Sequence, residues 1–120
     1  MNPSKELDEK VANDFLGWPP EPMKPNLNEI SPRMYGGWKK PDGARVDPLP
    51  KFSTDFNSEH ILIERLIHRK IGYRVLMKWQ SETSYNVKFT IYDREGNPLS
   101  EATESSGPLA LCCAVLGLRP

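Results

Sequence analysis

The sequence predicts an α+β fold in which helices pack on a central antiparallel sheet of four or five strands. Three observations lead to this class. A segment near the start has apolar residues at helical spacing, two segments after residue 72 alternate apolar and polar residues, and the chain closes on an apolar helical segment. The predicted order is helix, hairpin, helix, strands and helix, and the 120 residues form a single domain, 1–120.

The first predicted helix runs from Ser4 to Gly17. Leu7, Val11 and Phe15 recur every four residues and form one apolar stripe. Gly17 is a natural C-terminal stop, because glycine adopts the left-handed conformation readily. Prolines crowd the region that follows, and we expect residues 19–33 to form an irregular, proline-rich arm.

A short hairpin is predicted after the arm. The segments "RMYGGWKK" and "ARV" flank "PDG", in which proline fixes one dihedral angle and glycine accepts a positive one. We expect this hairpin to lie at an edge of the sheet, because its glycines weaken it as a central element.

The second predicted helix begins at Asp55 or Asn57 and ends near Ile71, with Gly72 as its stop. Its expected buried face consists of the apolar residues at helical spacing. These are Leu62, Ile63, Leu66, Ile67 and Ile71.

Two half-buried strands are predicted next, in "YRVLMKWQ" and "SYNVKFTIYD". Each alternates apolar and polar residues, and the polar turn "SETS" joins them as an antiparallel pair. "PLSEATES" suits one further strand at an edge. "SGPLALCCAVLGL" then predicts an apolar helix that Ser106 caps, with Pro108 in its first turn.

The composition excludes several classes of function. Lys plus Arg and Asp plus Glu both total 16, so bulk charge attracts neither duplex nucleic acid nor an anionic membrane surface. We expect no membrane association, because no apolar run approaches the roughly 18 residues of a membrane span. Cys112 and Cys113 are adjacent and are expected to be buried thiols in a reducing cytoplasm.

No constellation of catalytic residues is apparent, and we expect a protein that is not an enzyme and needs no cofactor or metal. His60 and His68 are two turns apart on the polar side of one helix, which favours a solvated face over a metal pair. The cysteines lack a basic neighbour that would lower the pKa of a thiol. A double-stranded-RNA-binding module is excluded by the last helix, whose first turn carries no lysine.

The candidate site is a group of aromatic, hydroxyl and charged residues in the irregular region and at the start of the second helix. Aromatic rings outside regular elements either cover a core or stack on a planar ligand, and both interpretations stay open. Hydroxyls and cations beside them suit a nucleotide or a phosphosugar. The candidate ligand-binding residues are Trp18, Tyr35, Trp38, Lys39, Asp42, Arg45, Phe52, Ser53, Thr54 and Asp55.

The stretch "LPKFSTDFNSEHILIERL" leaves open the same choice between a structural role and a ligand-binding role. A single cap residue starts a helix, and Asp55 or Asn57 can serve. Ser53 and Thr54 are then available for a ligand, although simple capping and turn chemistry explains them equally well.

Several of these pieces together resemble the phage ABA sandwich domain, a family of small phage-encoded accessory proteins. They are "DEKVANDFLGW", "GGWKKPDG", "LPKFSTDFNSEHILIERL", the two strands and "TESSGPLALCCAVLGL", and the longer loop from Pro19 to Pro32 departs from the pattern. The resemblance implies an α/β/α sandwich and a place in the host bacterial cytoplasm.

Two functional hypotheses follow. In the first, a phage protein binds and sequesters a small nucleotide-type immune signal of the cyclic ADP-ribose class, like a sponge, and so inhibits host anti-phage defence. In the second, an interaction module blocks a host protein through the proline-rich arm. We also expect a homodimer, because a short domain with an exposed strand edge and a mobile arm can enlarge a pocket by self-association.

Overall fold

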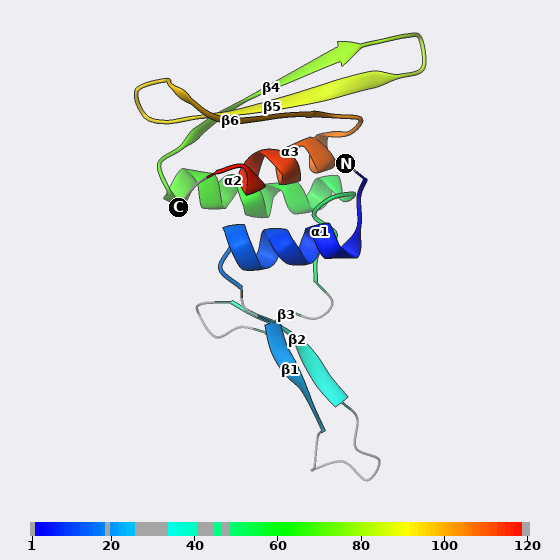
Figure 1. Ribbon diagram of the computed structural model, residues 1–120, viewed down its shortest axis with the longest axis vertical. Helices are drawn as coiled ribbons and strands as arrows, with labels where there is room; N and C mark the ends of the chain where they lie inside the picture. The colour runs from blue at the N-terminus through cyan, green and yellow to red at the C-terminus, as the bar shows by residue number, and fades with distance from the viewer. Residues whose placement is uncertain (1, 19, 26–33, 41–44, 47–48, 119–120) are drawn as a thin grey trace.

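The computed structural model describes residues 2–18, 20–25, 34–40, 45–46 and 49–118. It has an α+β architecture in which helical segments alternate with groups of three strands along the chain (Figure 1). The strands of the described residues divide into two antiparallel sheets of three strands each. The single central sheet of four or five strands that the sequence predicts is therefore not confirmed.

The first helix, α1 (Lys5–Lys10), continues into a π-helical stretch, Val11–Phe15. Ser4 caps α1, because its side chain accepts a hydrogen bond from the backbone N–H of Leu7 at 3.0 Å. The predicted stop is confirmed at Gly17, whose φ of +71° lies in the left-handed region that favours glycine. Leu7, Val11 and Phe15 are all buried, as their spacing predicts.

The smaller sheet consists of β1 (Pro20–Pro25), β2 (Met34–Lys39) and β3 (Arg45–Val46), in the order β1-β2-β3. The antiparallel pairing of β2 with β3 confirms the predicted hairpin, whose turn at 41–44 lies outside the described residues. The hairpin belongs to this separate sheet and does not lie at an edge of the larger one, which corrects the expectation. The expectation of an irregular arm is corrected at 20–25, where a strand forms, and residues 26–33 lie outside the described residues. β1 tolerates its prolines because it is an edge strand and its register with β2 is interrupted between Glu21 and Lys24.

The helix α2 (Glu59–His68) follows a short 3₁₀ turn, Phe56–Ser58. Its stop differs from the prediction: Lys70, at a φ of 58°, takes the left-handed position two residues before Gly72. The N–H of Ile71 donates to the carbonyl of Leu66 and that of Lys70 to the carbonyl of Ile67, which together close a Schellman motif. Within the predicted buried face, Leu62 and Leu66 are buried, but Ile67 is exposed.

The larger sheet consists of β4 (Gly72–Trp79), β5 (Tyr85–Tyr92) and β6 (Pro98–Glu104), in the order β4-β5-β6. β4 and β5 pair antiparallel along all eight residues, which confirms the predicted strand pair, and β6 confirms the further strand. The expectation that both strands of the pair are half-buried is wrong for β4, whose eight residues are all exposed. The last helix, α3 (Gly107–Leu116), begins at Ser106, whose side chain accepts from the N–H of Leu109.

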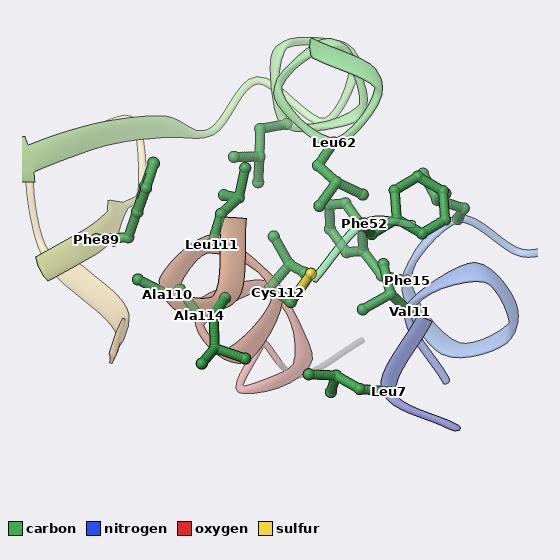
Figure 2. Close-up of a cluster of buried hydrophobic side chains, with 14 of the residues drawn as sticks. Leu7, Val11, Phe15, Phe52, Leu62, Phe89, Ala110, Leu111, Cys112 and Ala114 are labelled. Atoms are coloured by element: carbon green, nitrogen blue, oxygen red, sulfur yellow. The ribbon is translucent and has the colours of Figure 1, made fainter. Parts of the chain in front are cut away.

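The core lies between the larger sheet and the helices. α3 is buried along nearly its whole length and packs on β5 and β6, while α1 and its π-helical extension pack on the opposite side of α3 (Figure 1). Figure 2 shows Leu111 and Cys112 of α3 between Phe89 of β5 and the side chains of the first helix. The three helices lie on one face of the larger sheet, so the α/β/α sandwich implied by the resemblance is not confirmed.

Candidate functional site

The loop that leads into α2 folds back on itself before the helix begins. The N–H groups of Thr54 and Asp55 both donate to the carbonyl of Lys51, at 3.1 and 2.9 Å, and form a turn. This turn directs Phe52 into the core, where it is fully buried (Figure 2). The ring of Trp18 lies 6.0 Å from that of Phe52, centroid to centroid, so the end of the first helix and this loop meet.

Ser53 joins the same loop to the start of α1. Its backbone N–H donates to Oδ1 of Asp8 at 2.7 Å in a buried hydrogen bond, and its Oγ donates to the carbonyl of Ser4 at 3.5 Å. Both Ser53 and Asp8 are buried. Because a buried N–H without a partner is costly, this bond fixes the loop against α1. Ser53 therefore has a structural role that neither the capping nor the ligand interpretation included.

Asp55 caps the 3₁₀ turn, as the capping interpretation predicts. Its Oδ1 accepts the N–H of Asn57 at 2.9 Å, and its Oδ2 accepts the hydroxyl of Ser58 at 3.4 Å. Thr54 lies between the buried Ser53 and the capping Asp55, and it is exposed.

The structure brings together only part of the predicted ligand-binding group. Trp18, Phe52 and Ser53 lie together but are buried, and the ammonium of Lys40 lies 5.5 Å from the centroid of the Trp18 ring. The remaining predicted residues belong to the smaller sheet or lie beyond the description. The backbones of Tyr35, Trp38, Lys39 and Arg45 are in β2 and β3, their side chains are outside what the structure describes, and Asp42 lies outside the described residues.

A pocket of about 410 Å³ lies beside this junction, between the start of α1 and the loop 49–54. Two lysines, two serines, a threonine and a carboxylate contribute to its wall together with apolar groups. The lining residues are Pro3, Ser4, Lys5, Asp8, Leu49, Lys51, Ser53 and Thr54. We call it the α1–loop pocket. Sequence reasoning identified Ser53 and Thr54 but missed Lys5 and Asp8, because no local signal indicates that α1 meets a loop more than forty residues away.

The cysteines are poor nucleophiles. Cys112 is fully buried, which confirms its prediction as a core residue, and Cys113 is half-buried with its Sγ 3.7 Å from Oε1 of Glu104. Burial raises the pKa of both thiols, and nearby carboxylates raise it further. Both side chains therefore stay protonated at neutral pH. In the part of the chain that the structure describes, no three side chains of His, Cys, Asp or Glu lie close enough to hold a metal ion.

Comparison of the chain with protein-family models gives no match, and neither a curated protein nor a solved structure is found to be similar to it. The resemblance to the phage family stays a prediction. Within the described residues, no helix combines the length and the apolar character needed to cross a membrane.

Proposed function

We propose that the chain is a non-enzymatic binding protein that takes a small anionic molecule of nucleotide type in the α1–loop pocket. The observation that carries the proposal is the lining itself. Lys5 and Lys51 stand with the hydroxyl groups of Ser4 and Thr54 around a pocket of about 410 Å³. Pockets that bind small molecules typically measure about 300–1,000 Å³ and combine an apolar wall with a few polar groups.

The chemistry of these groups suits a phosphorylated ligand with a sugar. Lysine ammonium groups bind phosphate as compact point charges. The carboxylate of Asp8 repels an anion, and its Oδ1 already accepts a hydrogen bond from the N–H of Ser53 at 2.7 Å. A carboxylate at that position suits a ribose hydroxyl better than a phosphate, because it accepts hydrogen bonds and repels negative charge. As part of the same proposal, the ligand is a host immune signal of the cyclic ADP-ribose class, which the protein sequesters.

Thermal unfolding of the purified full-length chain tests the proposal, with cyclic ADP-ribose, ADP-ribose and inorganic phosphate as probes. A ligand at 100 times its Kd stabilises the folded state by about 2.7 kcal/mol, and the Tm rises with ligand concentration. We expect this rise with at least one nucleotide. Mass spectrometry of the supernatant after heat denaturation would identify a ligand that is carried through purification.

Two variants show whether the α1–loop pocket is the site. Lys51 is exposed, so Lys51→Gln should leave the Tm of the free protein unchanged and weaken nucleotide binding about tenfold or more. Lys78→Gln, at an exposed lysine of β4, is the matched control and should bind as the unchanged chain does. A Tm that no nucleotide moves, or binding that Lys51→Gln retains in full, would refute the proposal.

A second candidate function is protein–protein interaction. The proposed contact through the arm rests on residues 19–33, of which only 20–25 are described. A different observation favours this class of function, namely the uncovered apolar face of β4, which lies apart from the α1–loop pocket.

A further inference from the structure

β4 is an edge strand that carries Arg74 and Lys78 but lacks two other features that usually protect an edge, a proline and a bulge. It pairs with β5 along all eight residues with no register shift, and no second strand pairs with it among the described residues. Long, regular, apolar edges of this kind pair readily with another strand, because their outer row of backbone N–H and C=O groups lacks partners.

The face of β4 that continues the core is open to solvent. Tyr73, Val75, Met77 and Trp79 alternate along it and are 43, 45, 50 and 57% exposed. α3 covers β5 and β6, while the β4 ribbon runs beyond the helices at the top of the molecule (Figure 1). Monomeric proteins rarely expose contiguous apolar patches larger than a few hundred Å².

A groove of about 320 Å³ separates this face from α2. Phe56 and Ile63 form one wall, and Tyr73, Val75 and Met77 form the other. Glu59 also lines the groove, and its buried Oε1 has no hydrogen-bond partner within the described residues. The groove thus leaves apolar side chains open to solvent and the Oε1 atom of Glu59 without a hydrogen bond from the described residues.

We infer that β4 pairs antiparallel with β4 of a second copy of this chain, so that the two three-stranded sheets join into one sheet of six strands across a two-fold axis. A second copy offers a strand of the same length whose apolar residues fall on the same face. The net charge of zero gives no overall repulsion between copies. The inference is independent of the α1–loop pocket, which uses none of these residues.

The charges on the other face of β4 select the register. A pairing centred on Leu76 places Arg74 opposite Lys78, and like charges directly opposite one another are unfavourable. A pairing centred on Val75 places Arg74 opposite Leu76 and Lys78 opposite Gly72. It also sets Tyr73 against Met77 of the second copy on the apolar face. A pairing centred on Met77 also separates these charges, but it aligns only residues 75–79 of the strand, whereas the pairing centred on Val75 aligns residues 72–78. The register centred on Val75 is therefore the expected one.

The apolar area that β4 and the groove expose is in the range of a weak interface. An aromatic side chain presents about 150–250 Å² in all, so half-exposed Tyr73 and Trp79 each offer roughly 100 Å². With Val75, Met77 and Phe56, each copy offers about 400 Å² of apolar side chain, and two copies about 800 Å². The paired strand edges bring the total toward the 1,200 Å² or so at which specific interfaces begin.

A cysteine at the centre of symmetry tests both the partner and the register. Directly opposite residues of an antiparallel pair have Cβ atoms about 4.5–5.5 Å apart, near the range in which a disulfide forms. In the full-length chain, Val75→Cys should cross-link as a dimer under mild oxidation. Leu99→Cys, at an equally exposed position of β6, and the unchanged chain should remain single bands on a non-reducing gel.

The oligomeric state completes the experiment. Light scattering should give a dimer at micromolar concentration for the unchanged chain. Val75→Glu, which sets two carboxylates face to face, should raise the dimer dissociation constant by about a hundredfold or more. Leu99→Glu should leave the dimer intact, and circular dichroism checks that both variants fold. The inference is overturned by a monomer at all concentrations, by cross-linking at residue 99 and not at 75, or by a host protein captured in place of the second copy.

Discussion

Strands β4 and β5 offer a direct comparison, because they pair residue for residue and carry the same alternating pattern. In β5, Val87, Phe89 and Ile91 are buried, since α3 packs on that part of the sheet. In β4, all eight residues are exposed. Alternation thus predicts which side chains share a face, but it does not show whether the chain itself covers that face. The following three predictions test this difference.

The largest expected effect is at Phe89, the centre of the covered strand. Phe89→Ala should lower the free energy of unfolding by about 3–5 kcal/mol, because it opens a cavity beneath α3. Urea denaturation measures this loss. Leu76→Ala, on the outward face of β4, is the control and should change the free energy by less than about 0.5 kcal/mol. Similar losses at the two positions would show that β4 is covered as β5 is.

A smaller effect is expected for Val87 and Met77, which lie directly opposite one another. Val87→Ala removes two buried methyl groups and should cost roughly 2 kcal/mol at any protein concentration. Met77→Ala should cost little in dilute solution and progressively more as the copies associate. Thermal unfolding from about 1 to 100 μM, a range that spans weak association, measures this. A concentration-independent loss at Met77 would contradict pairing through β4.

The smallest effect concerns Glu59, which lines the groove between the open face of β4 and α2. Burial raises the pKa of its carboxyl, so the folded state binds its proton more tightly than the unfolded state does. The carboxylate therefore opposes folding as the pH rises through the folded-state pKa, and the cost is absent below the unfolded value. Glu59→Gln should raise the Tm at pH 7 relative to the unchanged chain and leave it nearly equal at pH 4. An equal shift at both values would exclude titration of Glu59 as its cause.

Local patterns predicted the secondary structure well. Ser4, Gly17 and Ser106 act as the predicted helix signals, and the turn between β4 and β5 joins the predicted strand pair. The second helix stop was misplaced, because Lys70 adopts a left-handed conformation that sequence reasoning reserves for glycine. The division into two sheets was not predictable, because strand patterns do not state which strands share hydrogen bonds.

The candidate site was predicted only in part. The stretch 49–57 does lie beside a pocket, but Phe52 and Trp18 are buried with the core. An aromatic residue next to prolines has the same local signature whether it packs inward or binds a ligand. The contact between Asp8 and Ser53 joins positions 45 residues apart, so no local pattern indicates it.

The ring contact between Trp18 and Phe52 has a consequence for how this protein tolerates change. The chain leaves the helical layers after Trp18 and returns before Phe52, and the two crossing points touch. The intervening segment, which contains the smaller sheet, is therefore an insertion whose two ends lie next to each other. Changing the length of such an insertion costs little closure entropy, about 0.6 kcal/mol for each doubling. A variant in which that segment is lengthened or shortened should therefore keep the packing around α3.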